Sequence, residues 1–535
     1  MRFLVSSLAL LAILVAPAAR AQTPGDCAPG RAQADLDVSD VRATLFNNGN
    51  LFYGNSTGAA YTVPKAGGVA PIYAANLWMA GVVADETRSS GATYNDFELW
   101  PGPLDEGGEL PDPDNCAQFD RIYVVSVLDV EQYEASGTAT PDLAEWPLGL
   151  GAPAVDGAGQ PIETNDRDRV LDLAAGERPA LSGSQMAFWV MNDVGNDHVR
   201  SGSAPLGVEV AVTAFAIISD EAALNQATVY RYTITNRSPN AIGGFRAGLF
   251  TDFDLGDFLD DYTGTDTTRG LRYVYNASDI DSGYGTPPAA GVDLLGGLST
   301  ARLVWKGGTP ATNESLASPE AYLCALEGKW NDCMDMRAFG QGYKTDGVPT
   351  VVGFPGDPVD GAFWSEENLD GEGTGNTSGD RYSLAAGPAA TLVEGESYRF
   401  DFALVFGQGT DRLDSITALR AASDRLQAAY DDGSLFQTVA VDAETAASPG
   451  PLALSVAPNP SRGIAEVAFE LAAPDEVRLR ILDVLGRTVA VLSAGALAAG
   501  PHRFTLESEA LPAGLYVAVL EAGGERSTQT FTVAR

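Results

Sequence analysis

The stretch from Thr251 to Asp266, "TDFDLGDFLDDYTGTD", concentrates residues that can do chemistry, because it holds six aspartates. Carboxylates at this density could cage a cation or supply acid–base groups. Five large apolar side chains are interleaved with them, and a fully solvated acidic face would seldom keep so many: Phe253, Leu255, Phe258, Leu259 and Tyr262. We therefore predict that the stretch packs onto the body, where an unpaired carboxylate is costly and needs a cationic partner.

Calcium is the first partner to consider, because Ca²⁺ takes six to eight oxygens from carboxylates, carbonyls and water. Asp252 and Asp254 should share one face of a strand end, and the following loop contains Gly256 and Gly264, which let a chain curl. The spacing does not match the calcium loop of an EF-hand. The predicted ligands of a structural Ca²⁺ are Asp252, Asp254, Asp257, Asp260, Asp261 and Asp266.

The sequence also allows other cationic partners for these aspartates and other metal sites. Arg269 and Arg272 follow the stretch directly and could neutralise it instead of a metal ion. The segment Glu367–Asp380, "ENLDGEGTGNTSGD", is a second and weaker Ca²⁺ candidate. Asp193 and His198, in "MNDVGNDHVR", could also bind a metal, although a turn whose polar side chains bond their own backbone is favoured there.

Catalytic motifs do not emerge from the residue pattern. A serine hydrolase needs a histidine, and His198 is the one histidine outside the C-terminal region. The sequence "LSGSQ" at 181–185 lacks the first glycine of a nucleophile elbow, and "GQGYKTDG" lacks the Gly-Lys-Ser/Thr ending of a phosphate loop. Paired carboxylates are uninformative in so acidic a chain. We assign no catalytic residue and favour a non-enzymatic protein.

The charge balance excludes several partners. The chain has 71 acidic and 33 basic residues, giving a formal net charge of −38. Such a charge repels nucleic acids and anionic membrane surfaces. It also destabilises the folded state unless salt screens it, since the Debye length falls to about 3 Å at 1 M salt. Few lysines among the basic residues complete a composition that indicates a salt-adapted, halophilic source.

The N-terminus predicts export. "MRF" provides a basic start, "LVSSLALLAILVAPA" an apolar run, and "ARA" a cleavage motif that ends at Ala21. We expect residues 1–21 to be a removed signal peptide and the mature chain to begin at Gln22. Since no later stretch reaches about 18 apolar residues, we expect no transmembrane span in the mature chain.

The four cysteines are consistent with an exported protein. An even number of cysteines in such a chain favours disulfides. Cys324 and Cys333 are close in sequence and could clip one loop, which leaves Cys27 with Cys116; the connectivity stays open. Zinc is disfavoured, because no Cys-x-x-Cys pair occurs.

Short β-branched and aromatic runs with frequent Gly and Pro predict a mainly β fold: a multi-domain β-sandwich body with one or two helices. We expect two β-rich parts at 22–220 and 221–440, a linker at 441–450 and a separate region at 451–535. The second part contains one clear helix near 414–432, with Asp414 as a possible N-cap. Predicted strands include 73–83, 121–128, 186–191, 208–218, 227–236, 245–254 and 397–409.

The C-terminal region reads as about seven short strands, which predicts an immunoglobulin-like seven-stranded β-sandwich. It also resembles the type A C-terminal sorting domain of the type IX (Por) secretion system. The matching segments are "PNP", "ILDVLGR" and "LPAGLYVAVLEAGG", with the motif residues Pro458, Asn459, Pro460, Asp483, Gly486, Arg487, Gly514 and Tyr516. This resemblance implies passage through the periplasm to the outer-membrane surface or the medium. It also implies contact with the translocon and a surface sortase, and attachment to anionic lipopolysaccharide.

The body, from Asp40 to Tyr430, is similar to large surface or secreted proteins carried by the same system, which implies a location rather than an activity. We therefore expect a non-enzymatic surface protein with structural calcium, serving adhesion, carbohydrate contact or envelope architecture. The alternative is a secreted polysaccharide hydrolase that uses paired carboxylates.

Overall fold

The computed structural model describes residues 26–54, 58–91, 93–94, 96–111 and 116–437, together with 454–457, 459, 461, 463–471, 474–483, 488–498, 500–508, 511–512, 514–522 and 525–534. The chain is mostly β, with 41% strand and 13% helix. It divides into two compact units, Met1–Val439 and Ala440–Arg535, and each is described by itself. The prediction of a mainly β, sandwich-type fold is confirmed.

The first sheet of the body contains ten strands, with the central order β1-β2-β3-β7-β16-β23-β20. Its pairings are antiparallel, and the long strands β7 and β16 form its centre. The strands are β1 (Gln33–Leu36), β2 (Arg42–Phe46), β3 (Asn50–Leu51), β6 (Tyr61–Thr62), β7 (Ile72–Val83), β8 (Glu86–Gly91), β16 (Ile242–Phe253), β20 (Thr300–Trp305), β23 (Arg381–Ala386) and β24 (Ala390–Leu392).

The second sheet contains nine strands, with the order β10-β13-β14-β15-β25-β19-β18-β17 and β9 beside β13. The strands are β9 (Trp100–Pro101), β10 (Tyr123–Ser126), β13 (Gln185–Asn192), β14 (Val208–Ala216), β15 (Thr228–Asn236), β17 (Asp261–Asp266), β18 (Leu271–Asn276), β19 (Ala289–Asp293) and β25 (Ser397–Gly407).

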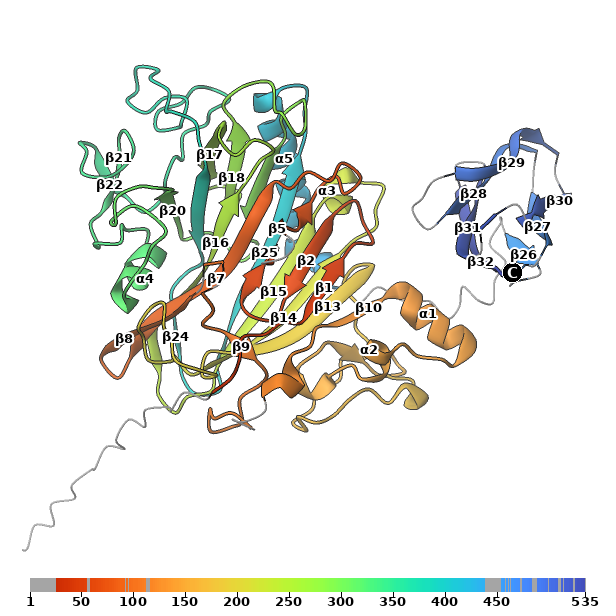
Figure 1. Ribbon diagram of the computed structural model, residues 1–535, viewed down its shortest axis with the longest axis horizontal. Coiled ribbons are helices and arrows are strands. Elements are labelled where there is room, and N and C mark those ends of the chain that lie inside the picture. Colours follow the sequence, from red (N-terminus) through yellow and green to blue (C-terminus); the bar gives the residue numbers. More distant parts are fainter. Residues whose placement is uncertain are drawn as a thin grey trace, which may run out of the picture. The chain divides into compact units, whose positions relative to one another are not determined.

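The two sheets lie face to face and share one hydrophobic core (Figure 1). Leu77 and Leu249 enter it from the first sheet, and Val212 and Phe402 enter it from the second. Both sheets combine strands from either side of residue 220, because β7 pairs with β16 and β14 pairs with β15. The expected division of the body at 220/221 is therefore wrong: the two parts build a single core. The linker at 441–450 lies outside the described residues.

Helices cover the outer faces of the sandwich. Helix α4 (Pro319–Leu326) packs on β7 and β8, and α5 (Arg412–Asp431) packs on β25 and β19. The predicted helix near 414–432 is thus confirmed as α5, but Asp411 is its N-cap, since its side chain accepts from the backbone N–H groups of Leu413 and Asp414.

Several short elements complete the body, so its helices are more numerous than the one or two expected. The helices are α1 (Val127–Ser136), α2 (Pro141–Ala144), α3 (Ala222–Asn225) and the 3-10 turns η1 (Cys116–Phe119), η2 (Leu148–Leu150), η3 (Leu173–Ala175) and η4 (Ser434–Phe436). The short strands are β4 (Tyr53–Gly54), β5 (Gly58–Ala59), β11 (Ala154–Val155), β12 (Arg178–Pro179), β21 (Met336–Ala338) and β22 (Val348–Thr350). Among the helices of the described residues, none has the length and apolarity needed to cross a membrane.

The cysteines form two disulfides, Cys27–Cys116 and Cys324–Cys333, as the spacing indicated. The first joins the N-terminal segment to η1, and both of its half-cystines pack against Trp100. The second links α4 to the turn that follows it.

The C-terminal unit is a small sandwich with seven strands in its described residues. One sheet has the order β26-β27-β30 and the other β29-β28-β31-β32. Val467, Leu479 and Phe531 lie in the core between them. The strands are β26 (Ser455–Ala457), β27 (Ile464–Leu471), β28 (Asp475–Asp483), β29 (Thr488–Leu497), β30 (Gly500–Glu507), β31 (Gly514–Ala522) and β32 (Glu525–Val533).

Candidate functional site

Two acidic stretches that are far apart in sequence meet at one end of the first sheet. Strand β16 ends at Phe253 and β23 begins at Arg381, and these two residues are paired. In an antiparallel ladder the next residues outward, Asp254 and Asp380, therefore face each other. Asp252 lies two positions back on the same face of β16. Ligand oxygens of Asp252, Asp254 and Asp380 converge to within 4.8 Å of one another.

The neighbours of this aspartate cluster (Asp252, Asp254 and Asp380) satisfy part of it. The Tyr94 hydroxyl donates to Oδ2 of Asp252 at 2.6 Å. The Lys306 ammonium, which directly follows β20, forms an ion pair with Oδ2 of Asp380. The second carboxylate oxygen of each of these two residues, Oδ1 of Asp252 and Oδ1 of Asp380, is buried and has no hydrogen-bond partner among the described residues. An unsatisfied buried carboxylate oxygen is rare and calls for a ligand or ion.

Electrostatics favour the same conclusion. Burial and the neighbouring Asp254 raise the pKa of Asp252 well above its ordinary value. Burial and Asp380 raise the pKa of Asp254 to about 6, and burial also raises the pKa of Asp380 despite Lys306. When all three carboxyls are ionised, they exceed the one ammonium by two negative charges, which is the charge of one divalent cation.

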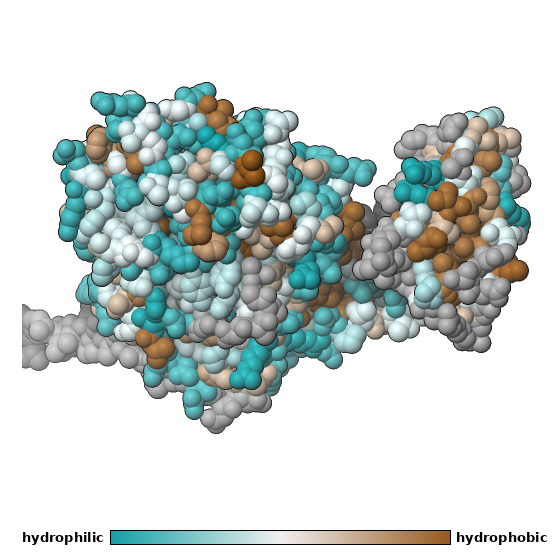
Figure 2. All heavy atoms as spheres, turned by 45° about the horizontal axis from the view of Figure 1, so that its top comes forward, coloured by the Kyte–Doolittle hydropathy of each residue, from teal (hydrophilic) through white to brown (hydrophobic). Residues whose placement is uncertain are grey.

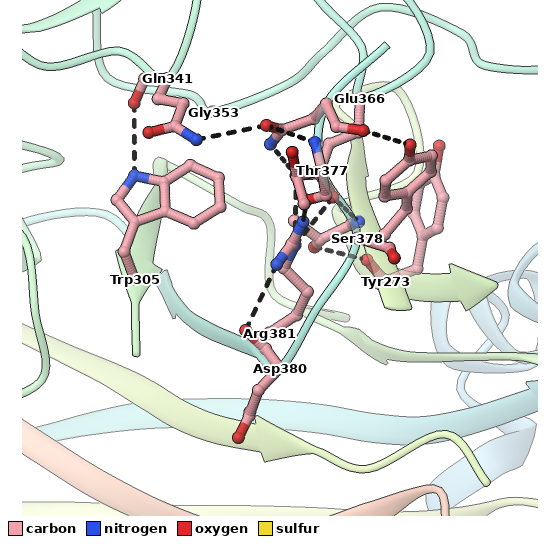
Figure 3. Close-up of polar contacts among 12 residues, drawn as sticks. Tyr273, Trp305, Gln341, Gly353, Glu366, Thr377, Ser378, Asp380 and Arg381 are labelled. Carbon is pink, nitrogen blue, oxygen red and sulfur yellow. Dashed lines mark hydrogen bonds and ion pairs between the residues drawn. The ribbon is translucent and has the colours of Figure 1, made fainter. Parts of the chain in front are cut away.

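A buried ion pair holds Asp380 in position. Arg381 donates through Nε to Oε2 of Glu366 at 2.9 Å, and through Nη2 to the carbonyl of Thr377 at 2.6 Å. Glu366 also accepts from the backbone N–H of Thr263 at 2.6 Å. Figure 3 shows the Arg381 side chain directed toward Glu366 and the Asp380 carboxylate directed away from it. The buried ion pair therefore fixes the loop between Glu366 and Asp380, and the Asp380 carboxylate faces Asp252 and Asp254.

The remaining aspartates of the opening stretch have separate partners. Asp266 accepts from Arg269 at 2.8 Å and also pairs with Arg420. Asp260 accepts from Asn276 at 2.7 Å, and Asp257 accepts from the N–H of Leu259 at 3.1 Å.

The acidic stretch is also less of a loop than expected, because Asp261 to Asp266 form strand β17. Asp261 is fully buried there and accepts from the backbone N–H of Leu255 at 3.2 Å. The expected convergence of all six aspartates is therefore wrong. Asp252 and Asp254 lie together, and Asp380, from the weaker second candidate, joins them.

Of the two glycines of the stretch, Gly256 lies in a turn as expected and Gly264 does not. Gly256 has φ of +73°, and a Cβ there would lie 2.1 Å from Oδ1 of Asp281, so this turn requires glycine. Asp281 was not anticipated, yet its carboxylate accepts from the backbone of Asp257, Gly283 and Tyr284 and shapes the turn. Gly264 lies within β17 and leaves room for the ring of Tyr273.

Asp193 and His198 serve the backbone. The carboxylate of Asp193 accepts from the N–H groups of Leu206, Gly207 and Val208 at 2.6, 3.0 and 2.8 Å. The ring nitrogens of His198 lie 2.9 Å from the carbonyl of Ser89 and 2.7 Å from that of Asp193. Both ring nitrogens thus face carbonyl oxygens, and Asp193 bonds the backbone of a segment 13 to 15 residues further along the chain rather than that of its own turn.

The arginine alternative holds in part. Arg269 pairs with Asp266 and with Asp424, at 2.8 Å in each case. Arg272 is fully buried and donates to Oγ1 of Thr265 and to the carbonyl of Gly353. The Arg269 contacts neutralise Asp266. In the aspartate cluster, the ion pair among the described residues is the one between Lys306 and Asp380.

In the C-terminal unit, the described motif residues form backbone and side-chain contacts within the sandwich. Oδ1 of Asn459 accepts from the N–H of Thr532 at 2.8 Å. Tyr516 is buried, its hydroxyl donates to the carbonyl of Pro512 at 2.9 Å, and its backbone pairs with Asp483. Gly514 is the first residue of β31. Pro458, Pro460, Gly486 and Arg487 lie outside the described residues, as do the predicted cleavage residues Ala21 and Gln22.

Residues 455–534 match the family model of the secretion system C-terminal sorting domain. The chain therefore carries a type IX secretion sorting domain. The sorting domain implies handling by the type IX machinery and export to the cell surface or extracellular space. The predicted family of the C-terminal region is thereby confirmed.

The chain was also compared with curated proteins and solved structures. A search of curated proteins found no match to the chain. Among solved structures, a polysaccharide lyase is 12% identical with a TM-score of 0.20, over 71% of this chain and 39% of that chain. Dimeric latent PorU from Porphyromonas gingivalis is 11% identical with a TM-score of 0.13, over 65% of this chain and 31% of that chain. The chain thus spans less than half of either protein.

Proposed function

We propose that this protein is a non-catalytic surface or secreted binding protein, and that Asp252, Asp254 and Asp380 hold a structural Ca²⁺. The observation that carries the proposal is the pair of buried, unpartnered oxygens, Oδ1 of Asp252 and Oδ1 of Asp380, in a cluster with two negative charges in excess. An ion there would satisfy both oxygens and neutralise the charge.

The donor set favours calcium over other metals. All three side chains offer hard carboxylate oxygens, without His or Cys, which disfavours zinc and copper. Two of the three, Asp254 and Asp380, directly flank strand ends, and Ca²⁺ tolerates irregular geometry better than Mg²⁺ does.

A hydrolase remains the second candidate, because the cluster also resembles an acid–base pair. Asp254, with a pKa raised to about 6 by burial and by Asp380, could act as an acid beside Asp380. Retaining glycosidases hold their carboxyl groups about 5–5.5 Å apart. The two functions exclude each other at this site, since a bound Ca²⁺ would keep all three carboxylates ionised and leave no acid.

The burial of the cluster favours the binding role. Asp252 is only 3% exposed and would hold an ion from inside, whereas Asp254 and Asp380 are partly exposed. A cavity of about 630 Å³ on another part of the body has Glu163, Arg167 and Arg237 as its charged lining residues, and so offers a single carboxylate rather than a pair. On the face shown in Figure 2, the described residues of the body are mainly hydrophilic with small, separate hydrophobic patches. Such a surface fits polar partners in water rather than a broad apolar interface.

Delivery completes the proposal. The sorting domain would carry the body from the periplasm across the outer membrane. A surface sortase would then remove it and join the body to anionic lipopolysaccharide, as the family resemblance implies. At the surface the body would serve adhesion, carbohydrate contact or envelope architecture.

Calcium titration of the EDTA-treated full chain tests the proposal. We expect one site by calorimetry and a higher Tm in Ca²⁺ than in EDTA. Asp252→Asn should weaken binding by about 100-fold or more, because ligand charge count sets Ca²⁺ affinity. Asp257→Asn is the matched control and should bind Ca²⁺ normally, since Asp257 contacts a backbone N–H of its own turn. Turnover on a glycan panel that Ca²⁺ inhibits would instead establish the hydrolase.

A further inference from the structure

Three tyrosines form an aromatic group beside the aspartate cluster. The ring centroid of Tyr53 lies 5.1 Å from that of Tyr73 and 5.4 Å from that of Tyr94. Tyr73 and Tyr94 are 6.1 Å apart. All three side chains are partly exposed. Tyrosine rings of this kind, apolar on the face and polar at the tip, suit contact with polar ligands in water.

Irregular backbone positions two of these rings. In the pairing of β7 with β16, Ala74 faces Asp252 and Ile72 faces Phe253, so Tyr73 is the extra residue of a β-bulge. Bulges commonly re-aim a side chain next to a functional site. Tyr94 has φ of +55°, a left-handed conformation that is unfavourable for tyrosine. Strained residues of this kind cluster at ligand sites.

The tyrosine group and the aspartate cluster are physically joined. Tyr94 contacts both Tyr53 and Tyr73 and donates its hydroxyl to Oδ2 of Asp252 at 2.6 Å. The Lys306 ammonium, which pairs with Asp380, lies 5.4 Å from the ring centroid of Phe258, and Phe258 is 40% exposed. The site therefore places apolar ring faces next to a cluster of hard oxygen donors.

We propose that the tyrosine group (Tyr53, Tyr73 and Tyr94) and the cation at the aspartate cluster together bind a neutral glycan with vicinal hydroxyl groups. This inference rests on the proposed Ca²⁺ site. Sugar rings present C–H faces that pack on aromatic rings. Their adjacent hydroxyls can replace water on Ca²⁺, which takes more oxygen ligands than three carboxylates supply when each binds through one oxygen.

Charge argues for a neutral rather than an acidic glycan. With Ca²⁺ bound, the three carboxylates, Lys306 and the ion sum to no net charge. The chain as a whole carries −38, which repels polyanions. A uronate or sulfated polymer would therefore gain little at the site and be repelled by the surface around it.

Glycan binding by the full chain tests the inference, with yeast mannan as the neutral probe and polygalacturonate as the acidic probe. We expect mannan to bind in Ca²⁺ and not in EDTA, and polygalacturonate to bind more weakly. Tyr73→Ala should weaken mannan binding by about tenfold, the effect of losing one stacked ring. The same variant should retain normal Ca²⁺ affinity, because among the described residues the tyrosine that donates a hydrogen bond to the cluster is Tyr94 and not Tyr73.

The controls separate the two proposals. Tyr133→Ala, on helix α1, removes a partly exposed tyrosine that stacks on Arg178 and should leave mannan binding unchanged. Normal Ca²⁺ binding without mannan binding, or mannan binding that survives Tyr53→Ala/Tyr73→Ala, would overturn the glycan inference and leave the Ca²⁺ proposal intact. If the unaltered chain does not bind Ca²⁺, both proposals fail.

Discussion

Arg381 donates through Nε to both carboxylate oxygens of Glu366, at 3.1 and 2.9 Å, and the two side chains are 6% and 0% exposed. The pair lies directly behind Asp380, whose carboxylate faces the opposite way (Figure 3). The same end of strand β23 therefore buries a charge pair and presents a predicted cation ligand.

Breaking this pair should destabilise the body strongly. Arg381→Met leaves Glu366 charged and buried, which costs about 3–5 kcal/mol, and chemical denaturation measures the loss. Replacing both residues, as in Arg381→Met/Glu366→Met, should recover much of it. The control is Arg425→Met, because Arg425 and Glu221 form a pair with side chains 39% and 55% exposed, and exposed pairs contribute little to stability. Equal losses for the two arginine variants would contradict the expectation.

In Ca²⁺-free buffer, Asp254 should make the protein less stable as the pH rises. Its pKa is about 6 in the folded chain against an ordinary 3.8. Between these values the folded state keeps a proton that the unfolded state has released, so the free energy of unfolding falls with rising pH. The full effect above pH 6 is at most about 3 kcal/mol.

The comparison with Asp254→Asn removes the titration of Asp254 together with its effect on the pKa of Asp252, whereas carboxyls that do not interact with Asp254 titrate identically in both proteins. The two stability profiles from pH 4 to 7.5 should diverge, with the variant gaining relative to the unaltered chain at higher pH. Saturating Ca²⁺ should remove the divergence or reverse it. Parallel profiles in EDTA would show that Asp254 titrates normally.

The predictable and unpredictable parts of this molecule differ in the range of the interactions involved. Strand β7 and helix α5 follow from local patterns of apolar residues, and their predicted bounds were close. The predicted strand 121–128 was wrong at its end, because Ser126 and Asp129 form a capping box that starts α1. That signal was present in the sequence but was masked by the apolar run "VVSVL".

The aspartate cluster could be predicted only in part. Asp252 and Asp254 alternate along one strand, so their common face was evident from the sequence. Their meeting with Asp380 depends on the pairing of β16 with β23, which is set by register between segments more than a hundred residues apart. Six aspartates in one stretch suggested one site, whereas tertiary pairing distributed them among Asn276, Arg269 and backbone donors.

Salt should stabilise this protein. With 71 acidic against 33 basic residues, self-repulsion opposes folding, and raising NaCl from about 0.05 M to 1 M shortens the Debye length from more than 10 Å to about 3 Å. We expect Tm to rise over this range by scanning calorimetry in EDTA. Sucrose at equal osmolality is the control, because it strengthens burial without screening charge. A Tm that is flat in NaCl would contradict the halophilic interpretation.

Removal of the sorting domain should abolish surface delivery. The C-terminal unit has its own core, with Val467, Leu479 and Phe531 buried between its sheets, and the main core of the body, in the described residues, is built from residues between Leu36 and Phe406. A chain ending before Pro451 should therefore fold its body normally but stay inside the outer membrane, as measured by protease accessibility of intact cells with a type IX system. Tyr516→Ala offers a point variant, because loss of a buried aromatic side chain costs about 3–5 kcal/mol, enough to unfold a domain of this size. Normal surface exposure of the truncated chain would mean that another segment directs export.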